Sequence, residues 1–180
     1  MTGMIMHQIT VQPSSTTASS GHGDRLAPDA ATLFVYGTLQ FDAVLEALIG
    51  RIPKKVSASA PGWRAAALGG RVYPGLVAAP GSVAPGVLFT DLSRREWMIL
   101  DAFEDDRYDL CEVALASGER GLAYVWPDGE VLEEDWDAEQ FRTHHLGEYA
   151  ARCARIAPGL IAGADQRTGR TAPERDENGA

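Results

Sequence analysis

Two short segments of the chain contain residue types that could do acyl chemistry together. Residues 33–39 read LFVYGTL, an apolar run that enters a turn, and residues 100–108 read LDAFEDDRY, with Glu104 following an apolar stripe. A turn exposes successive backbone N–H groups that can hold a carboxylate or a developing oxyanion. A carboxyl group can move a proton. Together the two segments predict an active site.

The first segment predicts a strand followed by a tight turn. Residues 33–36 are short and β-prone, and Gly37 is where we expect a positive φ, which glycine adopts without a Cβ penalty. An ordinary strand and turn without any function would show the same pattern, since short motifs match often by chance.

A helix is predicted to start near residue 93. Ser93 followed by Glu96 forms a capping-box pattern at its start. Within the helix, Trp97, Leu100 and Glu104 have the i, i+3, i+7 spacing of one face, so Glu104 should point inward. There we expect burial to raise its pKa, although a structural ion pair could also place it there.

The two acids that follow, Asp105 and Asp106, lie off this face. They are interpreted as a solvated end of the helix.

The two segments, in this order, resemble the γ-glutamylcyclotransferase-like family, within it the branch of AIG2-like proteins and γ-glutamylamine cyclotransferases. Three further stretches resemble it as well: residues 73–76 (YPGL), 123–126 (AYVW) and 136–141 (WDAEQF). The similarity covers roughly residues 32–157. Many relatives have Y-x-R after the catalytic acid, whereas this chain has Leu110 in the position of that arginine, which puts the identity of the substrate in doubt more than the fold.

The resemblance implies a cyclotransferase that needs no cofactor and no metal. The α-amine of a γ-glutamyl amide would attack its own γ-carbonyl, close a five-membered lactam and release an amine and 5-oxoproline. Glu104 would be the general acid and base. The glutamyl group would be bound by the turn, and two further tyrosines are candidate pocket walls, donors or packing residues; the substrate-binding set is Tyr36, Gly37, Thr38, Leu39, Tyr73 and Tyr108.

Composition limits the partners. The chain has 180 residues and a formal net charge of −9, which disfavours nucleic acids and anionic membranes. No phosphate-binding glycine motif occurs, and neither the cysteines nor the adjacent histidines have metal-ligand spacing. We expect a cytoplasmic protein that binds a small γ-glutamyl compound and does not span a membrane. Its oligomeric state is left open.

The predicted organisation is one domain over residues 31–157 between disordered segments at 1–30 and 158–180, which lack apolar periodicity. We expect strands at 32–36, 108–116 and 121–127, several short strands between 55 and 90, and helices at 41–49, 93–103 and 137–156. Gly50 should stop the first helix, and Asp137 should cap the last. Both tryptophans of the middle segments, Trp63 and Trp126, are expected in the core.

This mixture predicts an α+β fold, a small mixed and partly closed β-barrel with helices packed outside.

Two alternatives remain open from the sequence. One is a binding or scaffold domain that keeps the cyclotransferase fold without turnover, because fold does not fix function. The other keeps the chemistry and applies it to a γ-glutamyl-protected metabolite.

Overall fold

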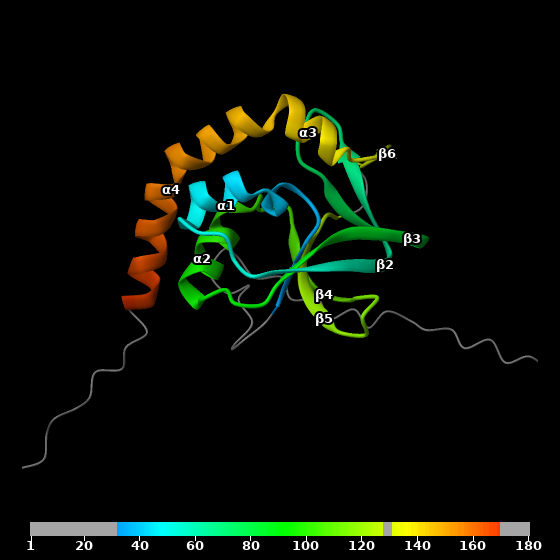
Figure 1. Cartoon of the computed structure of the whole chain (residues 1–180), viewed down its shortest axis with the longest axis horizontal. Helices are drawn as coiled ribbons and strands as arrows, with labels where there is room; N and C mark the ends of the chain where they lie inside the picture. The colour runs from blue at the N-terminus through cyan, green and yellow to red at the C-terminus, as the bar shows by residue number, and fades with distance from the viewer. Residues whose placement is uncertain (1–31, 128–130, 170–180) are drawn as a thin grey trace, which may run out of the picture.

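The computed structural model describes residues 32–127 and 131–169, which form one mixed sheet and its flanking helices. Figure 1 shows α1, α2 and α4 gathered on one side of the curled sheet, with α3 beside β6. In chain order the elements are β1 (Leu33–Val35), a 3-10 turn η1 (Thr38–Gln40), α1 (Asp42–Ile49), β2 (Lys55–Leu68), β3 (Gly75–Phe89), α2 (Arg94–Phe103), β4 (Asp109–Ala114), β5 (Arg120–Val125), β6 (Val131–Asp135), α3 (Ala138–His144) and α4 (Leu146–Gly169).

The sheet curls into a half-barrel. Its strand order is β4-β5-β1-β3-β2-β6, and β3 also pairs with β5. The pairs of β5 with β1 and with β3 are parallel, and the other pairs are antiparallel. Strand β3 can serve both neighbours because it is long: its end pairs with β1 and its start, at Leu76, pairs with β5. The predicted mixed, partly closed barrel with outer helices is confirmed.

Two long strands replace the several short strands predicted between residues 55 and 90. The Pro and Gly residues there bend the ladder instead of ending it. The register of β2 against β3 shifts between Pro61 and Trp63, where Gly62 has a φ of 82°. Between these two pairs β2 has one residue, Gly62, and β3 has four, residues 79–82, so β3 bulges out by three residues and the pairing continues on both sides.

The structure contains the predicted capping residues at three helix ends. The Ser93 side chain accepts a hydrogen bond from the Glu96 N–H, and the Glu96 carboxylate accepts one from the Ser93 N–H, so the predicted capping box is present. Gly50 ends α1 with a φ of 74°. The Asp137 side chain accepts bonds from two backbone N–H groups at the start of α3.

The last helix differs from the prediction. It is divided at His145 into α3 and α4, and α4 continues to Gly169, so residues 158–169 are helical and not part of a disordered tail. Pro158 lies inside α4, and proline normally weakens a helix. Packing compensates, because Ala164 is fully buried against Met98 and Ile99 of α2. The predicted tails at 1–30 and 170–180 lie outside the described residues.

Strand β6 was not predicted, because its acidic sequence has no β-prone apolar alternation. It is an edge strand that pairs only through β2, and most of its residues are exposed. Charged residues are common on such edges.

The core lies between the helices and the sheet. Trp126 is 2% exposed there, as expected, whereas Trp63 is only partly buried. None of the helices in the described part of the chain is long and apolar enough to cross a bilayer.

Candidate active site

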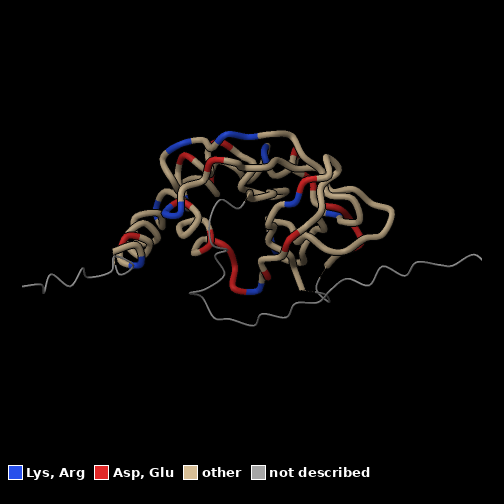
Figure 2. The backbone as a smooth tube through the Cα atoms, turned by 90° about the horizontal axis from the view of Figure 1, so that it is seen from below, with Lys and Arg blue, Asp and Glu red and all other residues tan. Residues whose placement is uncertain are grey.

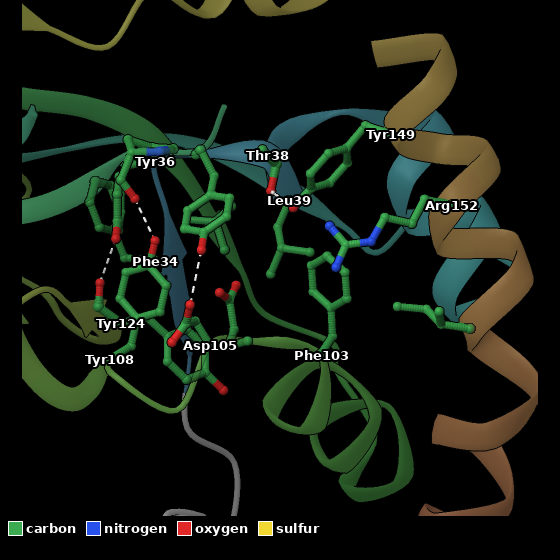
Figure 3. Close-up of a pocket in the computed structure, with 16 residues that line it drawn as sticks. Phe34, Tyr36, Thr38, Leu39, Phe103, Asp105, Tyr108, Tyr124, Tyr149 and Arg152 are labelled. Carbon is green, nitrogen blue, oxygen red and sulfur yellow. Dashed lines mark hydrogen bonds between the residues drawn. The ribbon is translucent and has the colours of Figure 1, made fainter. Parts of the chain in front are cut away.

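One cavity brings together the two segments that the sequence singled out. It has a volume of about 160 Å³ and lies between the β1–η1 turn, the end of α2 and α4 (Figure 3). All seven predicted site residues line it. The complete lining is Phe34, Val35, Tyr36, Gly37, Thr38, Leu39, Tyr73, Pro74, Phe103, Glu104, Asp105, Tyr108, Tyr124, Tyr149, Arg152 and Ile156.

Gly37 is needed for a reason other than the predicted one. Its φ is −116°, so the expected positive φ is wrong. A Cβ built on Gly37 would lie 2.9 Å from Cγ of Pro74, closer than side chains tolerate. Glycine therefore allows the turn to approach the start of β3, and this close approach forms one wall of the cavity.

The turn presents backbone donors to the cavity. The N–H groups of Gln40 and Phe41 bond to the carbonyls of Gly37 and Thr38. Among the described residues, the N–H groups of Gly37, Thr38 and Leu39 have no hydrogen-bond acceptor, as is usual at the start of a helical turn. Thr38 and Leu39 are buried, so these donors offer an anion a site with little competition from water.

Glu104 reaches the cavity from the end of α2 and not from its apolar face. The helix ends at Phe103, and Glu104 is the C-cap with an extended backbone, φ −68° and ψ 146°. The predicted stripe position is therefore wrong, although the side chain does line the cavity. Its charge adds to burial, which is the larger cause, in raising the pKa of Tyr36 and Tyr149. Three tyrosine hydroxyls are close enough to respond to it, since the pKa of Tyr108 is raised by burial and by the same carboxylate among others.

Two of the predicted tyrosines hold the cavity walls. The Tyr36 hydroxyl donates to the carbonyl of Tyr124 at 2.6 Å and accepts from the N–H of Leu76 at 3.1 Å. The Tyr108 hydroxyl donates to the carbonyl of Pro74. Both side chains are almost fully buried. These bonds join β1, β3 and β5 behind the cavity, so the Tyr36 hydroxyl is already used by the fold.

Asp105 belongs to a polar cluster at the edge of the cavity. The Tyr73 hydroxyl donates to Oδ2 of Asp105 at 2.9 Å, the Arg71 guanidinium is 3.1 Å from the same oxygen, and the Arg107 N–H donates to Oδ1 at 3.0 Å. Partial burial opposes ionisation, but these donors and the arginine charges lower the pKa of Asp105 overall. The predicted solvated role is wrong for Asp105 and right for the exposed Asp106. These contacts hold Asp105, the residue next to Glu104, in position.

Sequence reasoning missed the contribution of α4. Tyr149 and Arg152, one turn apart on this helix, line the cavity opposite Phe103. Thr38 Oγ1 donates to the Tyr149 hydroxyl at 3.4 Å, which links α4 to the turn. Tyr149 also packs edge-on against Phe103, with ring centroids 6.3 Å apart. The i, i+8 spacing of Phe141 and Tyr149 was the available signal, because it places both on one helical face.

The departure at Leu110 lies outside the cavity. Leu110 is on β4 opposite Tyr124 and packs against the core, and it is not among the lining residues. Within residues 32–127 and 131–169, no three His, Cys, Asp or Glu side chains form a group that could hold a metal ion.

The chain is similar to proteins of a known family. The family model described as gamma-glutamyl cyclotransferase, AIG2-like, matches residues 33–151. AIG2-like protein C of Arabidopsis thaliana is 37% identical over 127 residues, which are 67% of this chain and 74% of that protein. AIG2-like protein D of the same plant is 32% identical over 123 residues, 64% of this chain and 81% of that protein.

The fold has also been seen in a solved structure. A solution structure of an Arabidopsis thaliana protein superposes with a TM-score of 0.55 at 22% identity and covers 86% of this chain and 98% of that one. At this identity the likeness concerns the fold alone. On the evidence of the family model and the sequence relatives, the chain belongs to the AIG2-like gamma-glutamyl cyclotransferase family.

Proposed function

We propose that the protein is a γ-glutamyl cyclotransferase that converts a γ-glutamyl amide, amine conjugate or small peptide into 5-oxoproline and a free amine. The observation that supports this best is the meeting of Glu104 with the turn of residues 36–39 in one cavity. One group moves protons and the other binds a charged oxygen, and the intramolecular reaction needs no external nucleophile.

In this mechanism the turn binds and Glu104 transfers protons. The backbone N–H groups of Gly37, Thr38 and Leu39 hold an oxygen of the glutamyl group, either the α-carboxylate or the γ-carbonyl as it becomes an oxyanion. Glu104 takes a proton from the α-ammonium group, and the freed amine attacks the γ-carbonyl carbon. The bond to the departing nitrogen breaks as Glu104 returns the proton to it. The ring nitrogen loses its second proton to solvent and the released amine takes one up, so the reaction balances.

The magnitudes are sufficient for catalysis. Holding the amine and carbonyl in attack geometry can lower the barrier by up to ~7–11 kcal/mol in favourable intramolecular cases. One positioned acid and base adds about 10²–10⁴-fold in rate. The tyrosine-lined walls supply that positioning, because their hydroxyls are already bonded to the backbone of neighbouring strands.

The test incubates the protein with a panel of γ-glutamyl amino acids, amines and amides and measures the released 5-oxoproline by chromatography. We expect turnover of at least one compound by the wild type and none above background by Glu104→Gln. Asp106→Asn is the matched control, because Asp106 is an exposed acid two positions away that does not line the cavity. Absence of 5-oxoproline from the whole panel would support a binding domain that keeps the fold.

A further inference from the structure

The cavity has a closed end and an open end. Phe34, Tyr36, Tyr108 and Tyr124 at the closed end are at most 6% exposed, whereas Ile156 on α4 is 38% exposed. The volume of about 160 Å³ is below the ~300 Å³ where pockets for drug-sized ligands begin. A cavity of this size holds a small head group, so the rest of a substrate must lie at the open end.

Arg152 lies at this open end. It is an exposed residue of α4, and Figure 3 shows its side chain extending from the helix toward Phe103 and the interior of the pocket. In the part of the chain that the structure describes, its guanidinium makes no hydrogen bond and no ion pair with another side chain. Arg71, which contacts the cavity-lining Tyr73, differs because it is paired with Asp105.

Contacts of neighbouring residues place this part of α4 beside the cavity. One turn earlier, the Tyr149 hydroxyl accepts a hydrogen bond from Thr38, and the next residue, Cys153, is 1% exposed in the core. The hydrogen bond joins this part of α4 to the turn, and the buried cysteine shows that the same part packs on the core. Arg152 lines the cavity and its side chain extends toward it in Figure 3, so its guanidinium can reach an anion at the cavity mouth. An arginine binds a carboxylate through two parallel hydrogen bonds.

In the proposed mechanism the turn binds the glutamyl head group without this arginine. Its carboxylate or oxyanion can be held by the turn, which lies toward the closed end with buried Thr38 and Leu39. The chain as a whole carries a net charge of −9, and Figure 2 shows acidic and basic residues scattered over the described part of the backbone. An anionic leaving group thus gains nothing from the overall field, and its recognition requires a local cation.

We propose that Arg152 is a specificity-determining residue that binds a carboxylate on the departing amine, so that the preferred substrates are γ-glutamyl conjugates with an acidic leaving group. This inference rests on the proposed cyclotransferase function. In this proposal α4 selects the leaving group, and the turn and Glu104 carry out the cyclisation of every substrate.

The test compares two substrates that differ only in the charge of the leaving group, γ-glutamylalanine and γ-glutamylalaninamide. We expect wild-type kcat/KM to favour the carboxylate by roughly tenfold, the effect of a charge-assisted hydrogen bond at an exposed site. In Arg152→Gln the ratio should fall to within about twofold. Arg152→Lys should retain part of the preference, because lysine keeps the charge but loses the bidentate geometry.

Arg155→Gln is the matched control. Arg155 is an exposed arginine of the same helix that does not line the cavity, so its removal changes the net charge equally and should leave the ratio unchanged. Circular dichroism checks that each variant is folded.

The outcomes separate the two proposals. An unchanged ratio in folded Arg152→Gln, or an equal loss with both substrates, would overturn the role of Arg152 and indicate that it binds the glutamyl group or serves the fold. If the ratio of kcat/KM for the two substrates fell equally in Arg155→Gln, the preference would be an effect of net charge and the role of Arg152 would be overturned. If the wild type released 5-oxoproline from neither substrate nor any member of the panel, the cyclotransferase function itself would be wrong, and the Arg152 assignment would fall with it.

Discussion

Helix α2 carries a glutamate at each end, and the two have different surroundings. Glu96 at the N-terminal end bonds to Ser93 and is paired with Arg51, whose Nη2 is 2.8 Å from its carboxylate. Glu104 at the C-terminal end lines the cavity among tyrosines. The helix dipole favours a negative charge at the first position and disfavours it at the second.

Under the proposed function, this difference separates a structural glutamate from a catalytic one. Glu96 completes a capping box and an ion pair, and both hold the start of α2 against the loop that carries Arg51. The dipole does not support Glu104 in this way, and Glu104 lies beside the cavity, where the proposed function places a proton-transferring group. Helix α4 packs along both ends, with Tyr149 near Glu104 and Ala164 near Met98.

The largest expected effect is the loss of catalysis in Glu104→Gln. The amide keeps the shape of the side chain but cannot take up and return a proton, so kcat should fall by about 10²–10⁴-fold. The melting temperature should stay within a few degrees of wild type, because the C-cap backbone bond to Leu100 remains. Steady-state kinetics and thermal denaturation on the same preparation measure both. A Gln variant within tenfold of wild type would exclude Glu104 as the proton carrier.

The opposite result is expected for Glu96→Gln. It removes the charge that pairs with Arg51 while leaving every cavity residue in place, so the free energy of unfolding should fall by about 1–3 kcal/mol and kcat should not change. Urea denaturation gives the stability. If Glu96→Gln instead lost activity while staying folded, the division between a structural and a catalytic end of α2 would be wrong.

The same pair predicts a pH dependence of stability. Hydrogen bonds from Arg51, with help from Ser93 and despite partial burial, lower the pKa of Glu96 from 4.5 to about 2. Because the folded-state pKa is the lower one, the stabilisation is complete above the unfolded value and is lost as pH falls from about 4.5 toward 2. Urea denaturation across this range should show a shallower loss for Glu96→Gln than for wild type. Equal slopes would mean that Arg51 does not hold this carboxylate.

Local signals predicted much of the fold. Ser93 with Glu96, Gly50 and Asp137 each act within one helical turn of their own position, so the sequence alone identified three helix ends. The long strands β2 and β3 were missed because the effect of Pro61 and Gly62 depends on a partner strand that accepts a bulge.

The predicted site residues all line the cavity, but the physical reasons for their positions were not predicted. The family motif identified Glu104 and the turn, yet Gly37 is required by Pro74, and Asp105 is held by Arg71 and Tyr73, all from the segment before β3. Such contacts join residues far apart in the chain, and no spacing rule reports them. Arg152 was missed for the same reason, since only the packing of α4 brings it to the cavity.

A smaller effect is expected when the end of α4 is removed. A chain that stops at residue 169 should match the full chain in stability, whereas one that stops at residue 160 loses the buried Ala164 and its contacts with Met98 and Ile99, and the ion pair of Asp165 with Arg95. We expect a loss of about 1–2 kcal/mol from the apolar area exposed. Activity per folded molecule should remain, because Tyr149 and Arg152 precede the cut. Loss of turnover in a folded chain ending at residue 160 would show that the far half of α4 also serves the site.

The smallest expected effect concerns the other wall of the cavity. Gly37→Ala would place a Cβ 2.9 Å from Pro74 and force the turn away from β3, so its N–H groups would shift relative to Glu104. Overpacking of this size costs about 1 kcal/mol, which corresponds to a several-fold weaker Kd for a non-cyclisable γ-glutamyl analogue in calorimetry. Gly147→Ala is the control, because a Cβ at Gly147 in α4 meets nothing within 4 Å. Unchanged affinity in folded Gly37→Ala would remove the turn from the binding model and leave Glu104 as the sole support for the proposed chemistry.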